Sequence, residues 1–341
     1  MMHLVKEWPL PAHYDAEALD TVWRVPYQDR AQEARRWSET HRIGPAGEDE
    51  QTAALILIDV QNTFCLPDFE LFVAGRSGKG AVEDNRRLTE FIYRNLGGIT
   101  HITATMDTHR PLQIFHALFL VDEEGNHPPV NTMITYEEVK AGKWKVNPAA
   151  AAGLGVDQEY ADRFLRHYTK QLAEKEKYEL TIWPYHAMLG GIGHALVSGV
   201  EEAIFFHSVA RHTQAEYKIK GEHIFTEHYS AVGPEVLASP EGENIAHKDD
   251  DLLGLVKKYD RIMIAGQAKS HCVAWTVNDL LDQILGEDPS LADKVYLLED
   301  CTSPVVIPDV VDFTDQADRA FERFSQKGLH IVSSTDPISS W

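Results

Sequence analysis

Five short apolar segments recur along this chain, and each ends abruptly at polar or glycine residues. The first is AALILID at 53–59, and the others are GGITHITATMD at 97–107, DRIMIAGQ at 260–267, KVYLLED at 294–300 and GLHIVSS at 328–334. A short, continuous apolar run is typical of a strand that is covered on both faces of a sheet. This pattern restricts the chain to folds with a buried central sheet.

Helix-like segments separate these runs, at 81–96, 193–213 and 272–285. In the last of them the apolar residues recur at helical spacing and give one apolar face: Val273, Val277, Leu280, Leu281 and Ile284. Strands that alternate with helices indicate βαβ units. We therefore predict a three-layer α/β fold, with a mostly parallel central sheet and helices on both faces.

Two regions depart from this rhythm. Residues 1–50 lack sustained periodicity and are predicted to form an extension or arm that lies on the surface or on a neighbouring subunit. Residues 51–341 form the predicted main domain, with an insertion at about 118–178 near the mouth of the site. The insertion contains a loop-like stretch at 121–132 and a helical stretch at 157–177.

Composition limits the partners. Lys and Arg total 32 against 53 Asp and Glu, a formal net charge of −21, which disfavours nucleic acid. The three cysteines have no paired spacing and fit a reducing compartment, so we expect a cytoplasmic protein. We also expect no signal peptide and no membrane span, because no segment approaches the roughly 18 apolar residues that a span needs.

Two residues at predicted strand ends are candidates for chemistry. Asp59 ends a buried strand, where an unpaired carboxylate would be costly, so it has either a structural partner or a catalytic role. Cys272 opens a predicted helix, where unpaired backbone N–H groups favour the thiolate; the alternative is an ordinary buried cysteine. Core or surface filler is the better interpretation of Cys65 and Cys301.

Acid and imidazole groups gather at other segment ends. Asp107 and His109 stand two residues apart at a strand end, with His116 seven residues beyond His109, and WPYH ends at His186. A carboxylate with imidazoles suits Zn, Fe or Mn, although each residue taken alone has a structural interpretation. The Trp183 ring is suited to stacking on a flat ligand.

Five motifs follow one another along the chain: DVQNTF (59–64), DTHRP (107–111), WPYHA (183–187), KGEHIFTEHYSAV (220–232) and GQAKSHC (266–272). In this order, they resemble the motifs of the cysteine hydrolases of the isochorismatase-like superfamily, and within it the nicotinamidase/pyrazinamidase branch. The resemblance implies a catalytic triad of Asp59, Lys220 and Cys272. It also implies a cis peptide between Gln267 and Ala268, with the amides of Ala268 and Cys272 as the oxyanion hole.

The same resemblance implies a metal site of Asp107, His109 and His186, with His116 as a fourth or substitute ligand. The divalent ion would be Zn, with Fe or Mn as alternatives, and in nicotinamidases it holds the pyridine nitrogen. Phe64 and Trp183 match the aromatic residues that sandwich the ring, and His271 matches a histidine of some relatives. These are the expected substrate-binding residues.

The chain also departs from the family pattern. Ala187 stands where a cysteine is usual. The segment between WPYH and KG is long, so Lys218 competes with Lys220 for the triad position; Gly221 and the following YSA favour Lys220. Three further histidines of this region are interpreted as helix or pocket residues: His194, His207 and His212.

The resemblance predicts a small-carboxamide hydrolase that releases ammonia through a thioester, with nicotinamide to nicotinate as the leading reaction. One alternative is a different reaction on the same fold, with another amide, a carbamoyl or a ureido compound as substrate. An isochorismatase-type reaction is a second alternative, which Cys272 disfavours. The third is a binding protein without catalytic activity. The expected partners are a small-molecule amide and further copies of the chain, with neither nucleic acid nor membrane.

Overall fold

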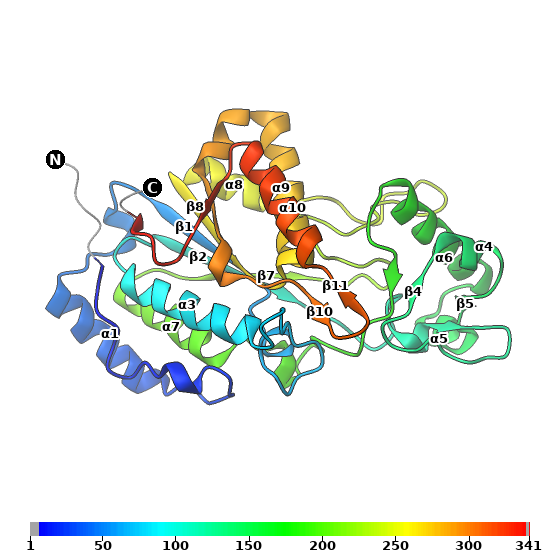
Figure 1. Cartoon of the computed structure of the whole chain (residues 1–341), viewed down its shortest axis with the longest axis horizontal. Coiled ribbons are helices and arrows are strands. Elements are labelled where there is room, and N and C mark those ends of the chain that lie inside the picture. Colours follow the sequence, from blue (N-terminus) through cyan, green and yellow to red (C-terminus); the bar gives the residue numbers. More distant parts are fainter. Residues whose placement is uncertain (1–6, 339–340) are drawn as a thin grey trace.

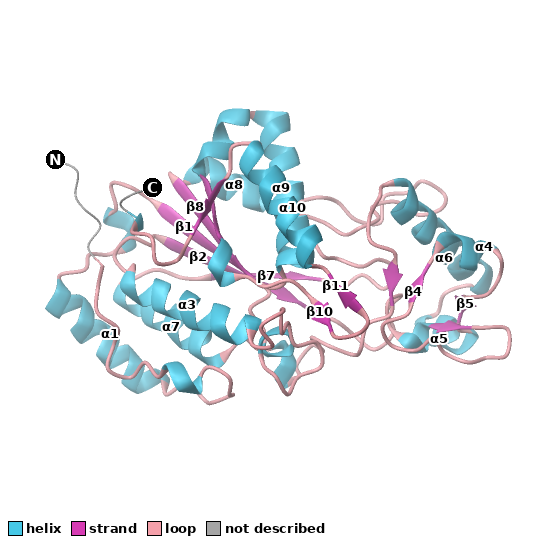
Figure 2. Cartoon of the chain, in the orientation of Figure 1, coloured by secondary structure: helices cyan, strands magenta, loops and turns pink. Residues whose placement is uncertain are grey.

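The computed structural model describes residues 7–338 and residue 341. A sheet of six parallel strands runs through the molecule in the order β12-β9-β8-β1-β2-β7 (Figures 1 and 2). The strands are β1 (Ala53–Ile58), β2 (His101–Asp107), β7 (Glu216–Lys220), β8 (Arg261–Gly266), β9 (Val295–Leu298) and β12 (His330–Val332). All five predicted apolar runs are strands of this sheet. The edge strand β7 escaped prediction because three of its five side chains are exposed.

Helices cover both faces of the sheet, which confirms the predicted α/β class (Figure 2). Their bounds are α1 (Tyr27–His41), α2 (Asn62–Cys65), α3 (Gly80–Arg94), α4 (Tyr136–Lys140), α5 (Pro148–Leu154), α6 (Gln158–Glu174), α7 (Ser198–Ala210), α8 (Asp251–Lys258), α9 (Ala274–Glu287) and α10 (Thr314–Gln326). In Figure 1, α3 and α7 lie on one side of the sheet, and α8, α9 and α10 on the other.

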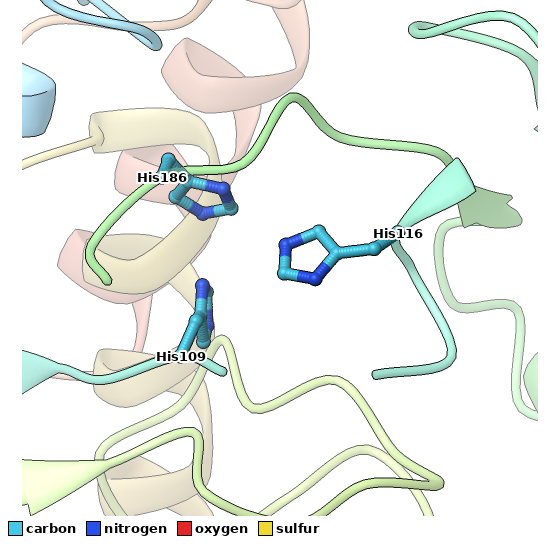
Figure 3. A group of neighbouring side chains, drawn as sticks. All are labelled: His109, His116 and His186. Carbon is cyan, nitrogen blue, oxygen red and sulfur yellow. The ribbon is translucent and has the colours of Figure 1, made fainter. Parts of the chain in front are cut away.

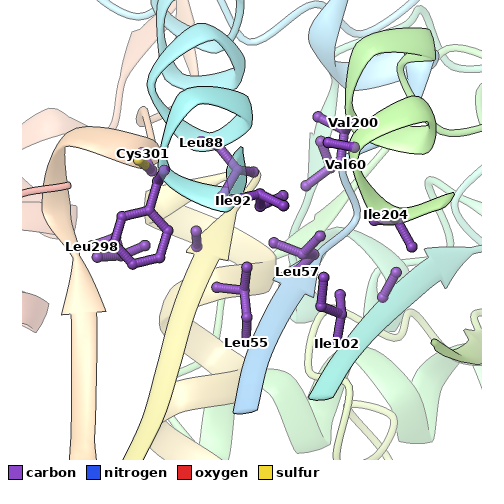
Figure 4. Close-up of a cluster of buried hydrophobic side chains, with 14 of the residues drawn as sticks. Leu55, Leu57, Val60, Leu88, Ile92, Ile102, Val200, Ile204, Leu298 and Cys301 are labelled. Carbon is purple, nitrogen blue, oxygen red and sulfur yellow. The ribbon is translucent and has the colours of Figure 1, made fainter. Parts of the chain in front are cut away.

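The strand β1 shows why its run is wholly apolar. Successive side chains of a strand point to opposite faces, and here Leu55 and Leu57 enter the core under α3 and α7 (Figure 4). Ala54, Ile56 and Ile58 enter the second core, which α8, α9 and α10 cover. Every residue of the strand is therefore buried.

A smaller lobe is built largely from the segment predicted as an insertion, and it lies at the opposite end of the molecule from α1 (Figure 1). It carries α4, α5 and α6 and three short strands, β3 (Leu120–Val121), β4 (Met133–Ile134) and β5 (Lys145–Val146). The strand β6 (Leu180–Thr181) pairs with β4, and β10 (Val306–Ile307) pairs with β11 (Val311–Asp312). The lobe has its own core, which includes Phe164 and Trp183. The domain bounds stay a prediction.

The N-terminal region is more regular than its sequence suggested. The helix α1 packs against α7, and its only fully buried residue is Ala34, so it shows little apolar periodicity. Arg211, at the end of α7, is buried and bonds to Asp49 and to the carbonyl of Gly44. Residues 1–6 of the predicted arm, and 339–340 of the main domain, lie outside the described residues.

The carboxyl ends of four neighbouring strands, β8, β1, β2 and β7, carry the candidate residues or lead to them. Asp107 is the register partner of Lys220, and Ile58, next to Asp59, is the partner of Gly266. Because parallel strands present their carboxyl ends at the same edge, residues distant in the sequence meet there. Within 7–338 and 341, no helix has the length and apolar character that crossing a bilayer requires.

Candidate active site

Three predicted residues meet at this edge. Lys220 Nζ lies 2.9 Å from Asp59 Oδ2 and 3.6 Å from Cys272 Sγ. The three residues follow or end β1, β7 and β8, and each is at most 7% exposed. The fold thus places an acid, an ammonium and a thiol in one buried cluster.

Asp59 adopts a backbone conformation that side chains rarely take, with φ of 47°. Its Oδ1 accepts a 2.5 Å hydrogen bond from Thr105 Oγ1, and the Asp59 amide donates to Thr105 Oγ1 at 3.0 Å. Complete burial raises the pKa of Asp59, although Lys220 and Thr105 lower it. The carboxyl is therefore poised to take up a proton more readily than an exposed aspartate.

Lys220 holds the cluster together. Its Nζ also lies 2.9 Å from Asp107 Oδ1 and donates to the His228 carbonyl at 2.8 Å. Burial alone would lower the pKa of Lys220, but Asp107 and Asp59 outweigh it and raise the pKa well above its ordinary value. Lys218 pairs with Asp249 and Asp251 at the surface, so the structure brings Lys220 and not Lys218 to Cys272.

Cys272 lies in a π-helical turn, Lys269–Val273, that leads into α9, and not in the first turn of the α-helix itself. Burial raises the pKa of its thiol well above the ordinary value. Lys220 lowers this pKa, but its effect does not offset burial and the nearby Asp59, so the expected preference for the thiolate is not met in the resting site. The resting thiol is therefore protonated, and it needs a base.

The turn between β8 and Cys272 is tightly fixed. The peptide between Gln267 and Ala268 is cis, as the motif implied. Gly266 has φ of 119°, and a Cβ there would lie 2.1 Å from the Ile58 carbonyl oxygen. Only glycine allows this approach of β8 to β1, which brings the turn beside Asp59. The amide of Gln267 donates to the same Ile58 carbonyl at 2.8 Å.

Three histidines converge beside this cluster. His109, His116 and His186 are buried, and each offers a nitrogen within 4.8 Å of the other two (Figure 3). His116 Nδ1 lies 3.3 Å from the Pro111 carbonyl, and His186 Nδ1 lies 2.8 Å from that of Pro184. A carbonyl only accepts, so each Nδ1 carries the proton and each Nε2 keeps a free lone pair.

Asp107 joins the histidines to the lysine. Its Oδ2 lies 3.1 Å from His109 Nε2 and 3.7 Å from His186 Nε2, while Oδ1 faces Lys220. Burial would raise its pKa, but His109 and Lys220 overcome this and hold the pKa well below the ordinary value. His116 Nε2 is buried and has no hydrogen-bond partner within 7–338 and 341. Such an orphaned nitrogen, with a carboxylate and two imidazoles nearby, fits a divalent metal site.

A small pocket, with a cavity volume of about 30 Å³, opens onto Cys272. Its lining includes the three residues predicted to bind substrate, Phe64, Trp183 and His271. Trp183 Nε1 donates to Tyr229 Oη at 3.1 Å, which fixes the indole. Burial lowers the pKa of His271 to about 3, so its ring is neutral in this wall. The aromatic and apolar side chains of this lining therefore suit a small, flat ligand.

The sequence interpretation missed Thr105 and Glu227. Thr105 binds Asp59 from the neighbouring strand, and two-residue spacing from Asp107 was its only signal. Glu227 lines the pocket beside Asp107 and His186. Burial raises its pKa to about 7, and His109 opposes that rise. Its position inside the KGEHIFTEHYSAV motif, two residues before Tyr229, was the sequence signal that could have identified Glu227 as a site residue.

The remaining candidates lie elsewhere. Cys65 and Cys301 are free and buried, and both belong to the core under α3. His207 bonds to the Ile99 carbonyl at 2.8 Å, whereas His194 bonds to Thr108 at 2.8 Å near the site. Ala187 is buried, and its amide faces the Thr63 hydroxyl at 3.3 Å.

Comparisons with known proteins bear on the fold. No protein-family model and no curated protein matches the chain. Among solved structures, the nicotinamidase of yeast has a TM-score of 0.50 at 19% identity, covering 82% of this chain and 99% of its own. The yeast enzyme bound to the inhibitor nicotinaldehyde gives 0.50 at 19%, covering 83% and 100%. A nicotinamidase/pyrazinamidase of Acinetobacter baumanii gives 0.48 at 19%, covering 85% and 99%.

The yeast structures match nearly their whole length, and the central sheet here is parallel with helices on both faces. This chain therefore has the α/β fold of the yeast nicotinamidase structures.

Proposed function

We propose that this protein is a cysteine-dependent amide hydrolase that converts a small carboxamide into a carboxylic acid and ammonia. The observation that carries the proposal is the buried cluster of Asp59, Lys220 and Cys272, beside a pocket whose lining includes Phe64 and Trp183. An acid, an ammonium and a thiol in contact supply a base, a cation and a nucleophile. A buried structural ion pair would not need the thiol.

In the first half of the reaction, Asp59 takes the proton of the Cys272 thiol as sulfur attacks the carboxamide carbon. The raised pKa of Asp59, which burial causes, favours this transfer. The C–N bond then breaks, and the proton on Asp59 passes to the departing nitrogen, which leaves as ammonia. Lys220 stays protonated and stabilises the negative charge that moves between sulfur and carboxylate.

The second half hydrolyses the thioester. Asp59 takes a proton from water as the water oxygen attacks the acyl carbon. The C–S bond then breaks, and Asp59 returns that proton to the sulfur, which releases the acid and restores the thiol. In both halves, the carbonyl oxygen becomes an oxyanion, and the amides of Ala268 and Cys272 are the proposed donors to it. Donors of this kind are worth about 3 to 4 kcal/mol of transition-state stabilisation.

Nicotinamide is the leading substrate. Phe64 and Trp183 give the pocket flat aromatic walls, and His271 adds a neutral imidazole. His109, His116, His186 and Asp107 would hold a divalent ion, with Zn preferred over Fe or Mn for this donor set. A bound ion would supply a Lewis-acid position for a ring nitrogen. A hydrolase of another amide, carbamoyl or ureido compound is the alternative on the same residues.

The surrounding features support a small-molecule partner. The formal charge of −21 opposes binding to nucleic acid, and the three cysteines are free and buried, which fits a cytoplasmic enzyme. A homo-oligomer with the N-terminal arm in its interface is part of the proposal, and the protein's mass in solution tests it.

The test is ammonia release from a panel of aromatic and aliphatic amides, with added divalent metal and with chelator. We expect release from nicotinamide, with a lower rate under chelation. Release from another amide alone would remove nicotinamide and keep the reaction class. Turnover of no amide under any metal condition would overturn the proposed function and favour a binding protein.

A further inference from the structure

A buried carboxylate contacts the turn that leads to Cys272 and is not part of the pocket lining. Asp84 belongs to the second turn of α3 and is 2% exposed. It is separated by 183 positions from its partner Gln267, whose Nε2 donates to Asp84 Oδ2 at 2.9 Å. The sequence motifs assigned no role to this residue.

Gln267 is fixed at three points. Its side chain donates to Asp84, its Oε1 accepts from the Ser303 amide at 3.3 Å, and its own amide donates to the Ile58 carbonyl at 2.8 Å. Gln267 is followed directly by Ala268, one of the two proposed oxyanion donors. The position of the Ala268 amide therefore depends on how the Gln267 side chain is held.

The carboxylate form of Asp84 suits this task. Burial raises its pKa to about 6, while Ser303, Gln267 and Arg87 limit the rise. At pH 7.5 the group is ionised and accepts on both oxygens, since Arg87 Nη2 donates to Oδ1 at 2.9 Å. A buried carboxylate is costly, so its presence behind a catalytic turn calls for a gain elsewhere.

We propose that Asp84 is a positioning residue, which acts through Gln267 to hold the Ala268 amide where the oxyanion develops. The inference rests on the proposed hydrolase function and deepens it. Asp84 touches neither the pocket nor the cysteine, so its effect belongs to the transition state and not to substrate binding.

Asp84→Asn is the informative variant. The asparagine side chain has one oxygen, so it can accept a hydrogen bond from either Gln267 or Arg87 but not from both. Its NH₂ group then faces the other of these two donors and cannot accept from it. On the amide that the wild type hydrolyses, we expect kcat to fall by about 10²-fold, the effect of misplacing a catalytic group by about 1 Å. KM should change less than about twofold, since ground-state contacts stay intact.

Two ligands separate positioning from general damage to the fold. The aldehyde that corresponds to the hydrolysed amide, nicotinaldehyde for nicotinamide, takes the thiol across its C=O bond: sulfur bonds to carbon, the thiol proton passes to the oxygen, and this oxygen lies where the oxyanion develops. The product acid, nicotinate for nicotinamide, forms no such bond. In Asp84→Asn the inhibition constant of the aldehyde should rise by a factor close to the fall in kcat, and that of the acid should stay constant. A merely structural role would weaken both ligands together or neither.

A double-mutant cycle tests the route. Gln267→Leu removes the side-chain link, so adding Asp84→Asn to it should lower kcat little further. Thr89→Val, a buried change on the same helix, is the matched control and should leave kcat unchanged.

The outcomes separate the two ideas. Equal kcat in wild type and Asp84→Asn, or additive losses in the cycle, would overturn the positioning role and leave the hydrolase proposal standing. A wild type inert towards every amide would overturn both.

Discussion

Replacing Lys220 by methionine removes the one cation that two buried carboxylates share. Lys220 Nζ lies 2.9 Å from Asp59 Oδ2 and 2.9 Å from Asp107 Oδ1, and the lysine is 2% exposed. Methionine keeps much of the side-chain volume and supplies no charge. Asp107 keeps His109 beside it, whereas Asp59 keeps only the Thr105 hydroxyl among the contacts described above, so Asp59 must take up a proton or stay charged without its ammonium.

Breaking a buried ion pair in this way costs about 3–5 kcal/mol. The free energy of unfolding of a domain is about 5–15 kcal/mol in total. Lys220→Met should therefore still fold if the wild type lies in the upper part of this range, but it should unfold at a clearly lower urea concentration than the wild type. Catalysis should suffer separately. A protonated Asp59 cannot accept the thiol proton, and loss of general-base action lowers kcat by about 10²- to 10⁴-fold.

Lys218→Met is the matched control on the same strand. Lys218 pairs with Asp249 and Asp251, whose side chains are 41% and 74% exposed, and such pairs contribute about 0–1 kcal/mol. Urea unfolding and ammonia release should therefore distinguish the two variants. If Lys218→Met abolished activity while Lys220→Met kept both activity and stability, the assignment of the triad lysine would be refuted.

Three further predictions follow from named contacts. Burial lowers the pKa of His207 from 6.5 to about 4, so the unfolded chain binds a proton there more readily than the folded chain. The neutral, buried His207 therefore contributes about 3 kcal/mol to the free energy of unfolding above pH 6.5, and this contribution is lost as the pH falls from 6.5 to 4. Urea unfolding of His207→Gln should show a shallower loss of stability across this window, and an unchanged slope would contradict the assignment. His116→Ala should lower bound divalent metal measured by mass spectrometry, whereas the exposed His127→Ala should not; equal metal content would count against His116 as a ligand. Trp183→Leu should raise KM for aromatic amides by up to about tenfold, the value of aromatic stacking, and leave aliphatic amides less affected; an equal effect on both would exclude stacking.

The sequence predicted the parts of the site that sit on apolar strands. Asp59 and Asp107 come directly after such runs, and parallel strands bring their carboxyl ends to one edge, so their proximity could be expected. Lys220 was harder, because β7 is an exposed edge strand without an apolar run. Only the motif spacing favoured it over Lys218, and the structure brings it to the cysteine.

Other features depend on contacts that no local pattern encodes. The raised pKa of Cys272 reflects the sum of burial and three charged neighbours, which a sequence cannot weigh. Asp84 reads as an ordinary helix residue, since Gln267 is 183 positions away. The helix α1 was missed because it packs on α7 with one fully buried residue and so lacks an apolar stripe.

The central claim is that Cys272 is the nucleophile, and ammonia release by Cys272→Ala tests it most directly. Cys65→Ala is the matched control, because Cys65 is an equally buried free cysteine in the core. The two variants are purified in parallel and assayed on the amide that the wild type hydrolyses fastest. Cys65→Ala should retain turnover, and Cys272→Ala should release no ammonia above the uncatalysed rate. Turnover by Cys272→Ala comparable to the wild type would contradict the account.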